Sequence, residues 1–276
     1  MATATETKTS AAEIFSTASY KPLGIIETLP GSDLSVYWHE DKEKAKEKEK
    51  DSKGSMAIII VFFVGFRLRV TTCFVSNKQK KKKKSAVFHL CDELYAQGCM
   101  VAMPDFFRGD PWPLEDYPVG DDVKKSELYN AWRESVASDI LVRKDIFEKV
   151  FPWIYHHNNK KSIAVIGIGW GGLQALKLAS DDRFACAAAI SAIQLDDAVV
   201  DRILCPIFYW EANGDISKDK VKAILDKKKF AKKCVYNTSS DQAQGFFGTL
   251  GNRSEAETKN AVNAVLQQLK KFLKSK

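Results

Sequence analysis

The residues with the clearest chemical meaning are three glycines, Gly167, Gly169 and Gly172, which lie between an apolar run and a helix-forming run. Residues 162–166 are mostly apolar and rich in β-branched side chains, as in a buried parallel strand, and residues 173–179 contain no helix breaker. Glycines suit such a turn because its backbone visits positive φ and its helix starts directly against the strand. The pattern predicts a strand–turn–helix unit where α/β proteins carry their chemistry.

Two interpretations of this turn use different chemistry. The spacing Gly167-x-Gly169-x-x-Gly172 matches the dinucleotide fingerprint, and Asp196 or Asp197 would then be the acid that binds the ribose. The same turn has the spacing of a nucleophile elbow, G-x-Nu-x-G, in which Gly169 stands at the nucleophile position. The glycines alone do not decide between a nucleotide site and a hydrolase site.

Other segments resemble those of one known family. Residues 167–172, GIGWGG, are similar to the G-x-C-W-G-G elbow of the dienelactone hydrolase (carboxymethylenebutenolidase-like) family, and residues 98–112 resemble its G-Y-x-V-x-x-P-D-F-F-x-G segment. Residues 205–215 and 244–246 fall where that family has its acid-bearing strand and its H-G-F sequence. The resemblance covers roughly residues 20–275 apart from two lysine-rich tracts. The resemblance implies an α/β-hydrolase fold and the hydrolysis of esters or lactones by a Cys–His–Asp triad.

The triad that the resemblance implies is incomplete in this chain. Gly169 replaces the nucleophile, Gln244 replaces the base, and only the acid, Asp215, is retained. Glycine has no side chain with which to attack a carbonyl, and an amide takes no proton near neutral pH. An acidic residue that the family carries at the end of an earlier strand would fall near Phe62 and is also absent. The leading hypothesis is a family member that has lost covalent catalysis and binds a small ligand or a protein partner.

Two alternatives remain open. The first is an active esterase or lactonase with a non-standard site, which would retain Asp215, Arg108 and the Trp170 backbone N–H as an oxyanion donor. Ser191, at the end of a predicted strand, is its hydroxyl candidate, although no elbow surrounds it. The second alternative is nucleotide binding by the glycine-rich turn.

Substrate-binding residues are expected on the loop that follows residues 99–103. The resemblance assigns this loop to a substrate carboxylate, and the guanidinium fork of Arg108 matches a carboxylate bidentately. Equally, Asp105 and Arg108 could serve only to fix the loop. Trp112 and Trp170 are further candidates to line the pocket. The expected ligand is a small acyl or carboxylate-bearing molecule.

Composition favours one soluble domain without a cofactor. The chain has 276 residues, 45% of them hydrophobic, which suits a single domain over residues 20–276 after a disordered segment 1–19. Its six cysteines form no C-x-x-C pair and have no histidine at ligand spacing, so no metal is expected. The longest apolar run, residues 56–66, is too short to cross a bilayer, and the N-terminus has no apolar signal region. We therefore expect a cytoplasmic protein; the sequence does not indicate its oligomeric state.

The net charge of +7 comes with lysine-rich insertions near residues 40–54 and 66–85. Lysine runs without aromatic residues are typical of solvated loops, so no specific nucleic-acid partner is expected. The second insertion lies beside the predicted site. It is either a regulatory or partner-binding loop or a translated non-coding sequence that ends in an A-rich tract.

Strand and helix patterns alternate along the chain. This alternation predicts a doubly wound, mostly parallel sheet of six to eight strands with helices on both faces, as in the α/β-hydrolase fold. Strands are expected at 34–38 (an edge strand), 56–64, 99–103, 162–166, 184–193, 205–210 and 233–236, and helices at 86–98, 123–155, 173–179, 217–225 and from residue 254 onward.

Overall fold

The computed structural model describes residues 22–39, 56–62, 85–110, 112–113, 122–157, 162–243 and 255–275. Some sequence-based predictions fall on other parts of the chain. The segment 1–19, the insertion near 40–54, nearly all of the insertion near 66–85, and Gln244 lie outside the described residues.

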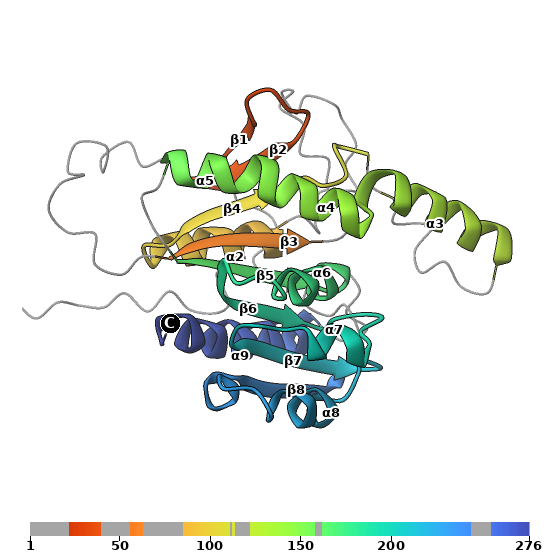
Figure 1. Ribbon diagram of the computed structural model, residues 1–276, viewed down its shortest axis with the longest axis vertical. Coiled ribbons are helices and arrows are strands. Elements are labelled where there is room, and N and C mark those ends of the chain that lie inside the picture. The colour runs from red at the N-terminus through yellow and green to blue at the C-terminus, as the bar shows by residue number, and fades with distance from the viewer. Residues whose placement is uncertain are drawn as a thin grey trace, which may run out of the picture.

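The described strands form one eight-stranded sheet in the order β1-β2-β4-β3-β5-β6-β7-β8 (Figure 1). β1 pairs antiparallel with β2, and β2 pairs antiparallel with β4, whereas all other neighbouring strands are parallel. The mostly parallel sheet predicted from the sequence is therefore confirmed. The strands are β1 (Ile25–Thr28), β2 (Ser35–Trp38), β3 (Ala57–Phe62), β4 (Met100–Pro104), β5 (Ile163–Ile168), β6 (Phe184–Ile190), β7 (Ile207–Asn213) and β8 (Val235–Ala243).

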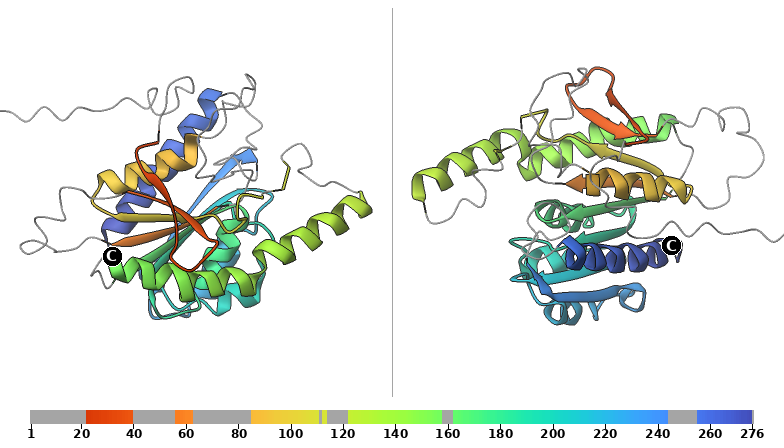
Figure 2. Two further views of the ribbon diagram at one scale, coloured as in Figure 1. Left: turned by 90° about the horizontal axis from the view of Figure 1, so that it is seen from above. Right: turned by 180° about the vertical axis from the view of Figure 1, so that it is seen from behind.

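The central strands are apolar along their length because both faces of the sheet are covered. Ile58, Ile59 and Ile60 on β3 are fully buried although successive side chains point to opposite faces, as expected for a parallel strand between two helical layers. One layer contains α2 and α9, and the other contains α4, α5, α6, α7 and α8 (Figure 2). The helices are α2 (Ser85–Ala96), α3 (Val123–Ala137), α4 (Asp139–Asp145), α5 (Phe151–His157), α6 (Trp170–Leu178), α7 (Asp197–Asp201), α8 (Lys218–Leu225) and α9 (Glu255–Lys274), with a π-helical turn η2 (Ile146–Val150) and a 3-10 turn η3 (Ala231–Lys233).

The long helix expected at 123–155 is present but broken. α3 ends at Ala137, and the extended backbone of Ser138 interrupts the helix. The hydroxyl of Ser138 accepts a hydrogen bond from the backbone N–H of Leu141 as the N-cap of α4. α4 then continues through η2 into α5. Figure 1 shows α3 extending away from the sheet, while α4 and α5 run across its face.

Two expectations about strands are corrected by the structure. The strand at 34–38 is not an edge strand, because β2 lies between β1 and β4, and β1 takes the edge. The strand expected at 233–236 is longer, because β8 runs on to Ala243 beside β7. Polar residues on β8, of which Thr238 is exposed and Ser239 and Gln242 are buried, hid its length, since an edge strand needs fewer apolar side chains than a central one.

Among the helices that the structure describes, none is both long and apolar enough to pass through a membrane.

Candidate functional site

The turn between β5 and α6 has the backbone geometry of an elbow. Gly169 adopts φ 61° and ψ −121°, a conformation that side-chain-bearing residues rarely adopt. Its N–H donates to the carbonyl of Ile190 at 2.9 Å, and its own carbonyl accepts from the N–H of Gly172 at 2.9 Å. The turn is thus fixed on one side by the end of β6 and on the other by the first turn of α6.

The glycines of this turn differ in the space around them. A Cβ on Gly167 would lie 1.8 Å from the carbonyl oxygen of Gly171, so α6 starts directly against β5 only because residue 167 has no side chain. A Cβ on Gly169, by contrast, would have no described atom within 4 Å. Residue 169, the predicted nucleophile position, therefore faces open space among the described residues, and glycine carries no reactive group there.

Two polar side chains reach the same edge of the sheet from neighbouring strands. Asp215 follows β7, and its carboxylate accepts from the N–H of Ala212 at 2.7 Å and from the hydroxyl of Ser191 at 3.5 Å. Ser191 follows β6, is fully buried, and has a positive φ of 52°. Because β5, β6 and β7 are parallel and adjacent, their carboxyl ends bring Gly169, Ser191 and Asp215 together. Gln244, the predicted base position, lies outside the described residues.

Five aromatic side chains form a series of ring contacts that begins beside the elbow. Trp170, directly after Gly169, has its ring centroid 5.4 Å from that of Phe107, and Phe107 stacks on Trp132 at 5.2 Å. Trp112 follows, 5.6 Å from Trp132 and 5.2 Å from Tyr129. We call Trp170, Phe107, Trp132, Trp112 and Tyr129 the aromatic row. The structure places the predicted residues Trp112 and Trp170 in this row, whereas Tyr129 and Trp132 were missed because their helical spacing resembles an ordinary buried stripe.

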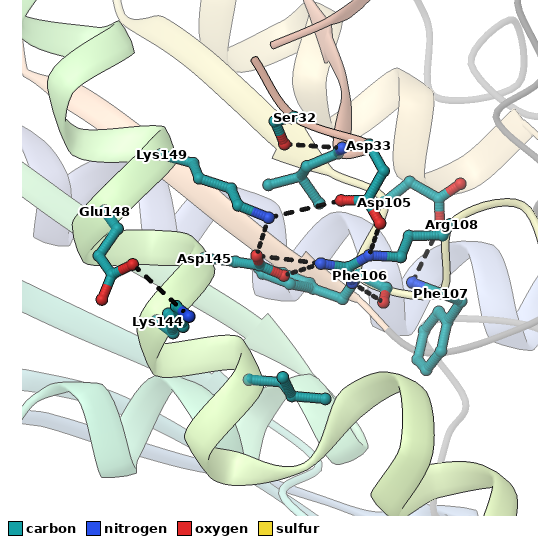
Figure 3. Close-up of polar contacts among 12 residues, drawn as sticks. Ser32, Asp33, Asp105, Phe106, Phe107, Arg108, Lys144, Asp145, Glu148 and Lys149 are labelled. Atoms are coloured by element: carbon teal, nitrogen blue, oxygen red, sulfur yellow. Dashed lines mark hydrogen bonds and ion pairs between the residues drawn. The ribbon is translucent and has the colours of Figure 1, made fainter. Parts of the chain in front are cut away.

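Arg108, the other predicted substrate-binding residue, is engaged with carboxylates of the protein itself. Its Nη2 donates to both oxygens of Asp145 at 2.8 and 3.0 Å, its Nε donates to Asp33 at 2.7 Å, and its Nη1 donates to the carbonyl of Phe106 at 2.9 Å. Lys149 lies 2.8 Å from Asp145 and 3.4 Å from Asp33. Figure 3 shows Asp145 between the two cations. We call Asp33, Arg108, Asp145 and Lys149 the ionic clasp.

The ionic clasp ties the loop after β4 to two distant parts of the chain. Asp33 comes from the turn between β1 and β2, and Asp145 comes from the end of α4. Burial alone would lower the pKa of Arg108, but its hydrogen bonds with Asp145 and Asp33 outweigh burial and raise that pKa. The hydrogen bond with Asp145 likewise raises the pKa of Lys149. The contacts of Arg108 therefore fix the loop that carries Phe107.

Removing Arg108 should destabilise the protein measurably. Arg108→Ala leaves Asp145, which is only 4% exposed, with Lys149 as its remaining cation in the ionic clasp, so we expect the free energy of unfolding to fall by about 2–3 kcal/mol. Asp33→Asn is the matched control, because Asp33 is 64% exposed and its ion pair should contribute at most about 1 kcal/mol. Urea unfolding followed by circular dichroism measures both. Equal losses in the two variants would show that the buried part of the clasp has no special role.

The effect of Asp33 should also depend on pH. Partial burial would raise the pKa of Asp33, but its hydrogen bond with Arg108 and the charges of Arg108 and Lys149 together lower it below the ordinary 3.8. A lowered carboxyl pKa stabilises the folded state above pH 3.8, and this contribution is lost as the pH falls further. The difference between the native chain and Asp33→Asn should therefore shrink in acid.

The described residues hold no group of three or more His, Cys, Asp or Glu side chains placed to bind a metal ion. The two acids considered for a nucleotide ribose have other contacts. Asp196 accepts from the N–H of Val199 at 2.8 Å as the N-cap of α7, and Asp197 pairs with Lys220 at 2.8 Å. Asp196 thus caps α7, and the ion pair of Asp197 joins α7 to α8.

Comparison with known proteins identifies the family. The sequence model of the dienelactone hydrolase family matches residues 81–276, which is well over half of the chain. The chain belongs to the dienelactone hydrolase family. The resemblance inferred from the elbow and from residues 98–112 is therefore confirmed. No curated protein matches the sequence.

Solved structures agree with this membership at the level of the fold. A dienelactone hydrolase candidate from Klebsiella pneumoniae superposes with a TM-score of 0.61 at 13% identity, covering 91% of this chain and 97% of its own. Est1E from Butyrivibrio proteoclasticus gives 0.50 at 11% identity, covering 91% and 98%. An acylaminoacyl peptidase from Pyrococcus horikoshii gives 0.57 at 10% identity, covering 92% of this chain but 42% of its own. At these identities the likeness shows the α/β-hydrolase fold alone.

Proposed function

We propose that this dienelactone hydrolase family member has lost covalent catalysis and uses the space in front of the elbow to bind a small molecule. One observation carries the proposal: Gly169 has the backbone conformation of an elbow but no side chain. Covalent hydrolysis by the family route needs a thiolate at this position, since the attack on the carbonyl forms a bond to sulfur. Without that sulfur, no acyl-enzyme can form at residue 169.

The base position supports the same conclusion. By resemblance, Gln244 stands where the family has its histidine, and a neutral amide neither removes a proton from a nucleophile nor protonates a leaving group. The acid position, Asp215, is occupied, but its oxygens accept from Ala212 and Ser191. Among the described residues, these contacts hold the loop after β7.

One observation favours the alternative of an active esterase with a non-standard nucleophile. Ser191 is fully buried, has a positive φ of 52°, and places its hydroxyl 3.5 Å from Asp215, next to the elbow. Strained polar residues of this kind cluster at functional sites. Against this role, a carboxylate is a weak base for a serine hydroxyl, and a fully buried oxygen has little access to a substrate carbonyl.

An alkyl fluorophosphonate separates the two functions. The reagent forms a phosphorus–oxygen bond with an activated serine and releases fluoride, so intact-mass spectrometry detects each adduct. We expect no adduct on the native chain, because the hydroxyl of Ser191 donates to the carboxylate of Asp215, and a carboxylate is a weak base for a serine hydroxyl. An adduct that maps to Ser191 and is absent from Ser191→Ala would contradict the proposal and support the esterase.

A further inference from the structure

We propose that the edge of the sheet opposite the elbow is a surface that binds an anionic lipid membrane peripherally. The surface consists of residues 201–204, before β7, and residues 226–233, before β8, which we call the basic edge. β5 to β8 are parallel, so both segments lie at the amino ends of their strands, whereas the elbow lies at the carboxyl end of β5 (Figure 1). The proposal goes beyond the proposed function and does not depend on it.

The two segments of the basic edge are in direct contact. The Nζ of Lys228 donates to the backbone carbonyl of Asp201 at 2.5 Å and lies 3.7 Å from the carboxylate of the same residue. This lysine therefore holds the turn after α8 against the end of α7, and the side chains of both segments form one surface.

The apolar part of the basic edge is Leu204, whose side chain is 55% exposed. Its neighbours Ile203 and Cys205 are buried, and its backbone N–H donates to the carbonyl of Ala179 at 2.9 Å. The backbone is thus fixed on both sides of Leu204, and the side chain is held at the surface. A single exposed leucine is ordinary on a folded protein, and what distinguishes Leu204 is the charge around it.

The basic edge has a large excess of positive charge. Its two segments contain six basic residues and two acidic ones, and each acid already has a lysine partner. Within the described part of the chain, four exposed cations of the basic edge make no ion pair: Arg202, Lys227, Lys229 and Lys232. The surface therefore attracts anions without first having to break ion pairs of its own.

An anionic membrane matches this combination of charge and apolar surface. Basic side chains attract anionic headgroups, and an apolar side chain among them enters the boundary between headgroups and acyl chains. Nucleic acid supplies phosphates but no apolar layer, and the one aromatic residue of the basic edge, Phe230, packs against the core instead of presenting its ring for base stacking. A lipid surface thus uses both Leu204 and the cations, and the elbow stays on the side that faces water.

Co-sedimentation of the full-length native protein with lipid vesicles tests the proposal. Vesicles of equal parts phosphatidylserine and phosphatidylcholine should bind at least about tenfold more tightly than phosphatidylcholine alone, and added salt should weaken the binding. Lys229→Glu/Lys232→Glu should weaken binding to the anionic vesicles at least about tenfold. Leu204→Ser should weaken it at least about threefold, because the apolar contact is lost while every charge remains.

Lys124→Glu/Lys218→Glu is the matched control, since it changes the net charge by the same amount. Both lysines lie in the first turn of a helix, α3 or α8, where a glutamate is favourable. Neither belongs to the basic edge, because Lys218 follows the carboxyl end of β7 and α3 extends away from the sheet (Figure 1). Circular dichroism checks that each variant is folded, and vesicle binding by the control should stay within about twofold of the native value.

Several results would overturn the proposal. Equal losses in the two double variants would show that net charge alone drives binding. Equal binding to both kinds of vesicle, or binding to neither, would exclude an anionic lipid as the partner. Native-like binding by Leu204→Ser would indicate a surface for soluble polyanions instead. All of these outcomes leave the proposed loss of covalent catalysis standing, because the elbow lies at the other edge of the sheet.

Discussion

The double variant Gly169→Cys/Gln244→His is expected to hydrolyse activated aryl esters at least about 10²-fold faster than the native chain. The cysteine supplies the nucleophile, the histidine supplies the general base, and Asp215 stands at the acid position. Space is available, since a Cβ at residue 169 meets no described atom within 4 Å. The backbone N–H of Trp170, at the start of α6, can donate to the developing oxyanion. Initial rates with a 4-nitrophenyl ester measure the gain.

The two single variants show whether the gain in hydrolysis rate requires both the thiol and the imidazole. Gly169→Cys alone has a thiol without a base and should give at most a slow stoichiometric burst, and Gln244→His alone has no nucleophile and should stay inactive. Residues that act as a unit are strongly non-additive, so the double variant should exceed the sum of the two singles. A thiol-blocking reagent should abolish its activity. A folded double variant that remains inactive would show that the base position inferred by resemblance is misplaced.

Gly167→Ala is expected to destabilise the fold by at least about 3 kcal/mol. Its Cβ would lie 1.8 Å from the carbonyl oxygen of Gly171 and 2.6 Å from the nitrogen of Gly172, and both atoms belong to backbone that cannot rotate away. Relief requires α6 to move off β5, which disturbs the fully buried residues packed between them. Urea unfolding followed by circular dichroism measures the loss of free energy.

Gly169→Ala is the matched control, two residues away in the same turn. It meets no steric contact with the described residues and incurs only the strain of an alanine at φ 61°, about 1–2 kcal/mol. The ranking, with Gly167→Ala clearly the worse of the two, is the result to check. Equal losses would mean that the close approach of α6 to β5 does not determine the stability of the elbow.

The fold could be predicted from the sequence because the residue patterns that specify its strands and helices are local. The apolar runs at 56–64 and 162–166 and the breaks between them specify buried parallel strands without knowledge of their neighbours, and the structure confirms both. The position of β2 inside the sheet was missed, since a short alternating run does not reveal how many partners it has. The full length of β8 was also missed, because its polar residues resemble those of a loop.

The residues of the candidate site could be predicted only where they belong to a local sequence motif. The glycine pattern predicted the turn between β5 and α6 that contains Gly169. The contacts of Arg108, by contrast, join it to Asp33 and Asp145, 75 and 37 positions away, and no local pattern encodes them. The sequence therefore left two roles open for Arg108, and carboxylate binding by it stays a prediction. The aromatic row has the same origin, since it joins residues from the loop after β4, from α3 and from α6.

The loss of covalent catalysis is tested most directly by initial rates of the native chain with a 4-nitrophenyl ester and an aryl lactone over a range of substrate concentrations. We predict a rate that rises linearly with substrate and matches that of a lysine-rich peptide at equal lysine concentration, as expected for uncatalysed reaction with surface amines. Saturable turnover above that rate, unaffected by a thiol-blocking reagent, would contradict the account and direct the search for a nucleophile to Ser191.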